Sequence, residues 1–292
     1  MSGINTNRTS ITLPTEVSSE ILQKTQEASA VMQLARQIPL PGRGVTIPMI
    51  TGDPEASWVD ETAIKPTSNP TLATKVMQAY KLAVIVPFSD EFQRDMPALY
   101  DAIVARIPGV LAQKFDATVF HGTAPGSNFD TLAGVTAQSI SGSGNSIYSA
   151  LVAADTDVAV AGGILNGFAL SPQAKGELLG AVDSNKRPLF INNVAEGAIP
   201  RLIGSPVHYS KGVYKVGDNS NPDVIGYAGD WTQAMYGIVQ GVKIDMSNQA
   251  TLTISNSQVN LWERNMFAIR AEIEVGFRCD TTMFEQFTRT HA

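Results

Sequence analysis

The residues that could form a metal site or an activated nucleophile are few and far apart. His121, His208 and His291 stand alone, with no second histidine four residues away and no cysteine beside them. Zinc and iron sites need clustered ligands, so the sequence predicts neither a metal nor another cofactor. Cys279 is the one cysteine, so it cannot close a disulfide within the chain, and no histidine in the adjacent sequence could activate it.

Motifs for phosphate binding and acyl transfer are also missing. The stretch "HGTAPGS" is rich in glycine but lacks the GK[ST] of a phosphate loop, and neither GxGxxG nor GxSxG occurs. The acid pairs Asp60–Glu61 and Asp90–Glu91 could do acid–base chemistry. Adjacent carboxylates in loops and first helical turns are more often solvated or placed against the helix dipole. The sequence therefore predicts that the chain is not an enzyme.

The composition is that of a globular chain with little affinity for nucleic acid. The 292 residues are 43% hydrophobic and carry a formal net charge of -6. A broad basic face for DNA is not expected, because phosphate binding needs clustered lysine and arginine. The polar start "MSGINTNRTSITLPTEV" has no apolar core of a signal peptide, and no window approaches a membrane span.

A long loop lies between two predicted strands. The loop "ASWVDETAIKPTSNPTL", residues 56–72, combines a tryptophan, two carboxylates and a Lys-Pro pair. "GVTIPMI" before it and "TKVMQAYKLAVIVPFS" after it alternate apolar and polar residues, the latter through Val76, Tyr80, Leu82, Val84 and Val86. A loop of about 20 residues is uncommon within a compact domain, so we expect it to be functional or to extend away from the body.

The rest of the chain alternates helices and strands. Residues 1–14 predict an extended arm, and apolar spacing from Pro14 to Ala35 predicts a helix. Residues 90–121 predict one long amphipathic helix that Pro108 kinks or breaks. A Ser/Gly linker near 141 opens a second unit, with a helix, a buried strand "NGFALS" and a helix capped by Ser171. "MFAIRAEIEVGFR" predicts a long closing strand with one apolar face.

This order of elements resembles the Hong Kong 97-like fold of tailed-phage major capsid proteins, from about residue 15 onward. The resemblance rests on "WVDETAIKPTSNPTLATK", "DATVFHGTAPGSNFDTLAGV", "VIGYAGDWTQAMYGI" and "NMFAIRAEIEVGFR", four stretches in the family's order and spacing. It implies an α+β fold with an N-terminal arm, an extended E-loop hairpin, a P-domain with a long spine helix, and an α/β A-domain. The implied borders are 1–40 for the arm and helix, 41–87 for the E-loop, 88–135 for the spine helix and turn, 136–235 for the A-domain, and 236–292 for the closing P-domain strands.

An extended hairpin needs a neighbour to cover its apolar side chains. We therefore expect Trp58, Val59, Glu61 and Pro66 to contact another subunit. The arm suits the same role, because a segment that orders on assembly can wrap neighbouring copies.

The resemblance also implies a cross-link. In the founding member, an E-loop lysine forms an isopeptide bond with an asparagine of another subunit, assisted by a glutamate of a third. The matching positions are Lys65 in "AIKPTS", Asn265 in "RNMF" and Glu272 in "RAEIE". On a regular strand Asn265 and Glu272 would point to opposite faces, which fits a site built across subunits. The alternative is that Lys65 forms an exposed salt bridge and that Glu272 is simply solvated.

The sequence thus predicts a major capsid protein that assembles from hexamers and pentamers into an icosahedral virion shell around double-stranded DNA, in the host cytoplasm and without a membrane. Expected partners are further copies of the chain, a portal, and scaffolding or decoration proteins. The founding member begins with a scaffolding segment that a protease removes, whereas Met1 leads almost directly into the arm, so a separate scaffold or none is expected. The alternatives are an encapsulin-like nanocompartment and, in another class, an enzyme with a mobile lid loop.

Overall fold

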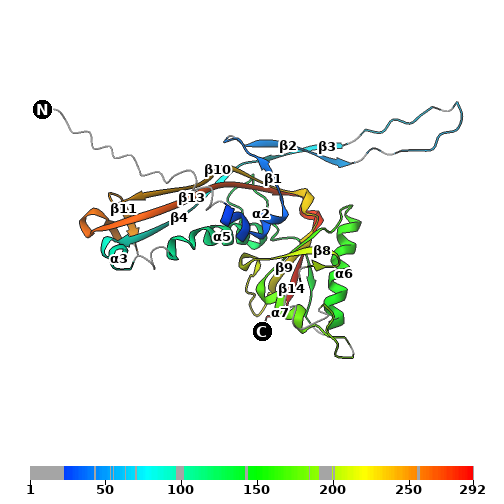
Figure 1. Ribbon diagram of the computed structural model, residues 1–292. Coiled ribbons are helices and arrows are strands. Elements are labelled where there is room, and N and C mark those ends of the chain that lie inside the picture. Colours follow the sequence, from blue (N-terminus) through cyan, green and yellow to red (C-terminus); the bar gives the residue numbers. More distant parts are fainter. Residues whose placement is uncertain are drawn as a thin grey trace.

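The computed structural model places two sheets side by side and a hairpin that extends away from both (Figure 1). It describes residues 23–42, 44–52, 54, 56–62, 64–69, 71–96, 102–141, 144–183, 185–190, 199, 201–254 and 257–291. The expected N-terminal arm therefore lies outside the described residues. Among those that are described, no helix has the length and apolar character needed to cross a membrane.

The first sheet has four strands in the order β1-β10-β13-β4. Their bounds are Arg36–Pro39, Ala234–Ser247, Met266–Cys279 and Tyr80–Ser89. The predicted one-sided closing strand is confirmed as β13, whose alternate residues from Phe267 to Phe277 are buried against helix α5 (Ile107–His121). On the opposite face, β13 carries Arg270, Glu272 and Glu274, paired with neighbours on β4 and β10.

The predicted helix over 90–121 is broken. Asp90–Asp95 forms the short helix α3, residues 97–101 are not described, and α5 begins only at Ile107. Pro108 lies in the first turn of α5, where its missing amide donor costs nothing, so the expected break falls just before it.

The predicted strand over 74–89 is likewise two strands in different sheets. β3 (Thr71–Met77) pairs with β2 (Val45–Gly52), whereas β4 starts at Tyr80 in the four-stranded sheet. The Gln78 amide donates to the Asn128 carbonyl (3.4 Å) at the break. Val76 is consequently exposed and does not share the half-buried face of Tyr80, Leu82, Val84 and Val86.

The second sheet has six strands in the order β5-β14-β9-β6-β8-β7. Their bounds are Thr136–Ser139, Phe284–Arg289, Asp223–Gly229, Gly167–Leu170, Ser205–Tyr209 and Arg201–Leu202. The predicted buried strand is confirmed as β6, and the capping role of Ser171 is confirmed by its bond from the Ala174 amide (3.2 Å). The terminal strand β14 joins this sheet between β5 and β9, although the sequence grouped residues 236–292 with the other sheet.

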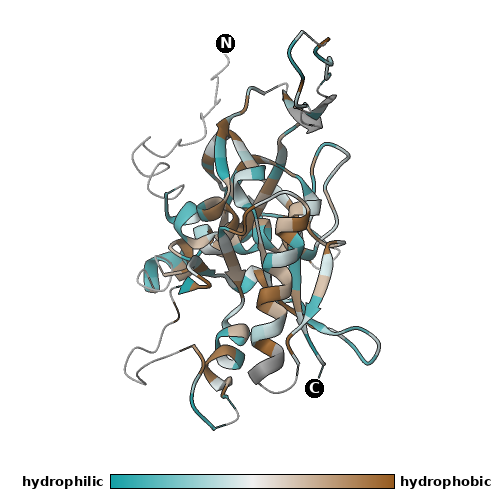
Figure 2. Ribbon diagram, turned by 90° about the vertical axis from the view of Figure 1, so that its right-hand side faces the viewer, coloured by the Kyte–Doolittle hydropathy of each residue, from teal (hydrophilic) through white to brown (hydrophobic). Residues whose placement is uncertain are grey.

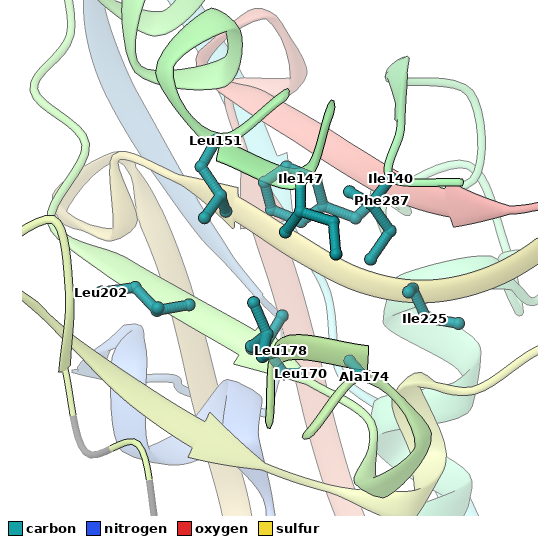
Figure 3. A pocket seen from close by; sticks show the side chains of 9 residues that line it. All are labelled: Ile140, Ile147, Leu151, Leu170, Ala174, Leu178, Leu202, Ile225 and Phe287. Atoms are coloured by element: carbon teal, nitrogen blue, oxygen red, sulfur yellow. The ribbon is translucent and has the colours of Figure 1, made fainter. Parts of the chain in front are cut away.

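Helices α6 (Gly144–Val160) and α7 (Pro172–Gly180) cover one face of the six-stranded sheet. Figure 2 views the molecule from the α6 side and shows brown hydrophobic residues along this helix, between paler and teal ones. Beneath the helices, nine apolar side chains enclose a space of about 10 Å³, as drawn in Figure 3. That volume is at the lower limit for one water molecule and its lining is apolar, so it is part of the core and not a ligand site.

A buried carboxylate connects helices α5 and α2 (Ala30–Leu34) with the turn that follows β8 of the six-stranded sheet. Asp116 of α5 is fully buried and accepts bonds from Ser29 Oγ (2.6 Å) and from the Ala30 amide (2.9 Å) at the start of α2. It also accepts from the Val31 amide (3.3 Å) and from Ser210 Oγ (2.6 Å). Ser210 caps the 3-10 turn η2 (Lys211–Val213), which follows β8 of the six-stranded sheet. Burial raises the pKa of Asp116 against the opposing effect of these four donors.

The described residues also form a second hairpin and several short 3-10 turns. Strands β11 (Thr251–Ile254) and β12 (Ser257–Asn260) pair with each other beyond the end of β10. The 3-10 turns η3, η4 and η5 span Trp231–Gln233, Trp262–Arg264 and Thr281–Met283.

Candidate subunit interface

The tip of the β2–β3 hairpin is the most exposed apolar part of the described chain. Trp58 and Ile64 are 105% and 95% exposed, and Val59 is 37% exposed. Glu61, Lys65 and Pro66 are exposed as well. The tip reaches far from the body in Figure 1, so these side chains have little of their own subunit to pack on.

Asn265 lies at the opposite end of the four-stranded sheet from this tip. It follows η4 in a left-handed conformation (φ 50°, ψ 51°), which asparagine tolerates better than most residues. Its carbonyl accepts from the Asp90 amide (2.9 Å), which ties the start of β13 to the start of α3. Its side chain is left exposed.

Glu272 lies on β13, opposite Lys243 of β10 and Ala83 of β4. Its side chain is 17% exposed, and its Oε2 is 3.7 Å from Nε of Arg270. Within one chain the structure does not bring Lys65 to this strand: the hairpin extends to the upper right in Figure 1, whereas β13 begins at the left, where Met266 pairs with Ser89.

Four charged side chains line up on this face of the sheet. Asp245 Oδ2 accepts from Arg270 (2.6 Å) and lies 3.2 Å from Lys243 Nζ, while Arg270 also approaches Glu272. Burial opposes ionisation of Asp245, but the bonds from Arg270 and Lys243 outweigh it and lower its pKa. The other oxygen, Oδ1, is buried and has no hydrogen-bond partner among the described residues.

Beside these charges lies a groove of about 400 Å³. Its lining comes from β4, β10, β13 and the start of β11: Ile85, Lys243, Asp245, Met246, Ser247, Ala250, Leu252, Ala268 and Arg270. Ile85 and Met246 are 48% and 39% exposed. Lys243 and Asp245 were not predicted from the sequence, although their alternation in "GVKIDMS" places both on one face of a strand.

Two of the three histidines are used in structural bonds. No group of three or more potential metal ligands occurs among the described residues. His291 Nδ1 is 2.7 Å from Asp223 Oδ1, and His121 Nε2 is 3.0 Å from the Gly212 carbonyl. Burial raises the pKa of Cys279, which makes its thiol a poor nucleophile.

Comparison with known proteins gives one consistent result. Residues 9–279 match the phage capsid family. The chain is 30% identical to the probable major capsid protein of Mycobacterium phage L5, covering 96% of this chain and 90% of that protein. It is 27% identical to the major capsid protein of Staphylococcus phage 80alpha, covering 90% and 80%.

Solved structures give the same fold. A chain from Gordonia phage Cozz superimposes with a TM-score of 0.75 at 24% identity, covering 91% of this chain and 88% of that one. A chain from Mycobacterium phage Bobi gives a TM-score of 0.73 at 20% identity, covering 100% and 96%. The family match covers most of the sequence and confirms the prediction of a structural protein rather than an enzyme. This chain belongs to the phage capsid family.

Proposed function

We propose that copies of this major capsid protein form hexamers and pentamers that close into the icosahedral head of a tailed phage around double-stranded DNA. The chain is a structural protein of the virion shell. The observation that supports this mode of assembly best is the outlying β2–β3 hairpin with Trp58 and Ile64 at its tip. Portal, scaffolding and decoration proteins are the further partners of such a head.

The structure of the hairpin favours contact with another copy of the chain. Its two strands pair with each other in a sheet of their own, anchored at the base by the small cluster of Leu40, Ile47 and Met77. A two-stranded hairpin is marginally stable in water by itself. Fully exposed apolar side chains at its tip add a cost that a neighbouring subunit would remove by covering them.

We assign the parts of the Hong Kong 97-like fold to the chain on this basis. The hairpin within 41–87 serves as the E-loop, and α5 within 88–135 serves as the spine helix. The four-stranded sheet, with residues 236–279, forms the P-domain, and the six-stranded sheet, mostly within 136–235 and completed by β14, forms the A-domain. A supporting feature is the division of the strands into a four-stranded and a six-stranded sheet, with a second buried cluster under α6 and α7.

The receiving surface for the tip is the outer face of the four-stranded sheet. The groove there combines apolar side chains, Ile85 and Met246, with the charges of Lys243, Asp245 and Arg270. A tip that carries Trp58 and Ile64 next to Asp60, Glu61 and Lys65 matches such a mixed surface. Glu272 lies on β13, which lines this groove, and Asn265 directly precedes that strand.

Docking of the tip would also allow a covalent cross-link between Lys65 of one subunit and Asn265 of another. The neutral Lys65 amine would attack the Asn265 side-chain carbonyl, forming an Nζ–Cγ amide bond as the Cγ–Nδ2 bond breaks and ammonia leaves. Glu272 of a further subunit would accept the lysine proton and return it to the leaving nitrogen. All three side chains are accessible to some degree, and no other reactant is needed.

Electron microscopy of the protein expressed alone tests the proposed assembly, and a boiled denaturing gel of the same sample tests the proposed cross-link. Shells, tubes or rings of six and five subunits support assembly, and a ladder of covalent oligomers that Lys65→Ala or Asn265→Ala abolishes supports the cross-link. Lys114→Ala, an exposed lysine on α5, is the matched control and should keep the ladder. A monodisperse monomer or dimer, even with scaffold present, contradicts the proposal, and shells without a ladder contradict only the cross-link.

A further inference from the structure

The outward side of α6 carries an apolar strip that no described part of its own chain covers. The helix buries Ile147, Leu151, Ala154 and Val158 against the sheet. Tyr148, Val152 and Val160 are nevertheless 56%, 40% and 82% exposed, and Ile164, just after the helix, is 77% exposed. Single exposed apolar residues are ordinary. Three of them at four- and eight-residue steps on α6, with a fourth just beyond its end, form a patch of the kind that marks an interface.

The strip is also acidic. Asp155 and Asp157 are exposed on the same helix, and α6 contains no lysine or arginine. Asp157 accepts a bond from the neutral Gln138 amide (2.8 Å), which leaves its charge uncompensated. We call Tyr148, Val152, Asp155, Asp157, Val160 and Ile164 the α6 strip.

A surface of opposite charge lies around β7. Arg201 and Ile203 are exposed at this edge strand and its turn. In the segment after α7, Lys186 and Arg187 are exposed and Val182 and Leu189 are each 38% exposed. The end of α7 approaches β7, because Leu178 of α7 and Leu202 of β7 line the same small cavity. We call Val182, Lys186, Arg187, Leu189, Arg201 and Ile203 the basic patch.

One carboxylate, Asp183, lies within the basic patch, and it accepts hydrogen bonds from backbone amides of its own turn. Asp183 Oδ1 accepts from the amides of Asn185 and Arg187, at 2.8 Å each, and so holds the turn that presents Lys186 and Arg187. The patch keeps an excess of positive charge, whereas the α6 strip has only negative charge. Both surfaces have apolar side chains beside their charges, as interfaces between subunits do.

The two surfaces lie at opposite ends of the six-stranded sheet. α6 contacts β5, β14 and β9, whereas the basic patch surrounds β7, and β5 and β7 are the two edges of the sheet. Two different, complementary surfaces on one subunit pair head to tail, and such contacts close into rings when the rotation between subunits allows it.

We propose that the α6 strip of one subunit packs on the basic patch of the next, and that this contact repeats around each ring of the shell. This inference rests on the proposed function, because it names the surfaces that join subunits within hexamers and pentamers. Like charges across this contact should prevent ring formation, since their juxtaposition is strongly unfavourable when desolvated.

Charge reversal tests the pairing directly. Asp155→Lys with Asp157→Lys gives a subunit whose two surfaces are both basic, and Arg187→Asp with Arg201→Asp gives one whose two surfaces are both acidic. Each double variant alone should lower the assembled fraction by more than about tenfold in sedimentation velocity. The combined fourfold variant restores opposite charges and should assemble again.

Mixing the two double variants gives a sharper result. In a 1:1 mixture, basic and acidic subunits can alternate around a ring, which closes for six subunits but forces one like-charged contact in a ring of five. The mixture should therefore form hexamers, tubes or sheets but no closed shells. Recovery from two inactive variants also excludes misfolding as the reason for their failure, and thermal unfolding of each variant checks this independently.

The inference fails if the wild type assembles and both double variants assemble equally well, or if neither the fourfold variant nor the mixture recovers any rings. Failure of the wild type itself to assemble would instead refute the proposed function.

Discussion

Replacing Asp116 with alanine should destabilise the subunit strongly, because it removes the acceptor for four donors at the junction of the two sheets. Ser29 Oγ and Ser210 Oγ each already accept a backbone amide, from Met32 (3.1 Å) and Gly212 (3.2 Å), so their hydroxyl hydrogens are directed at Asp116. The substitution would leave two hydroxyls and two helix-start amides without this acceptor.

The magnitude follows from these four bonds. A buried donor left unsatisfied costs about 1–3 kcal/mol, but the hydroxyls can turn and water can enter, so we expect a loss of about 3–5 kcal/mol in the free energy of unfolding. Ser29→Ala removes one of the donors and the cap of α2, and should cost about 1–2 kcal/mol.

Urea unfolding of the unassembled subunit, followed through the fluorescence of the buried Trp231, measures both values. Asp95→Ala is the control, since this carboxylate is exposed on α3 and bonds to the adjacent Arg94. It should leave the unfolding midpoint unchanged. A loss below about 1 kcal/mol for Asp116→Ala would refute the role given to this carboxylate.

Three further predictions concern the tip, a partly buried arginine and pH. Trp58→Ser should leave urea unfolding of the subunit unchanged, because the side chain is 105% exposed, yet reduce particle yield; a parallel loss of subunit stability would contradict this. Arg278→Ala should cost about 2–4 kcal/mol in urea, because Arg278 donates to Asp130 (2.6 Å) at 11% exposure; an unchanged midpoint would contradict it. Hydrogen bonding, chiefly from the Gly217 amide (2.7 Å), outweighs burial and lowers the pKa of Asp223. The ionised Asp223 carboxylate therefore stabilises the folded subunit above the unfolded pKa of about 3.9, and this stabilisation is lost as the pH falls below that value. Asp223→Asn should therefore cost stability at pH 7 and progressively less in acid, and a cost that does not vary with pH would refute this assignment.

Much of the fold is readable from local pattern. The alternation from Phe267 to Phe277 predicts β13 because one face of that strand packs on α5 while the other meets solvent. Ser171 before Pro172 predicts the start of α7, because capping is a local interaction.

Features set by distant contacts were not predictable in this way. The strand over 74–89 divides at Gln78 because residues near Asn128, from another part of the chain, bond there. The return of β14 into the six-stranded sheet, parallel to β5, has no local signature at all.

Some important side chains could also be recognised in the sequence, whereas others could not. Trp58 was singled out because an apolar residue in a polar loop is visible in sequence, and the structure places it in solvent. Asp116 was overlooked because it looks like one acid on a helix. It falls between Ala112 and Phe120 on the buried face, which was the available sign that it needs partners.

In the proposed assembly, copies of this chain build a shell through the outlying hairpin. A cryo-electron microscopy map of particles assembled from the wild-type protein would locate residues 54–69 of each subunit. We expect density for Trp58 and Ile64 against the outer face of a neighbour's four-stranded sheet, near Arg270. Particles in which the hairpin contacts only its own subunit, or stays in solvent, would contradict it.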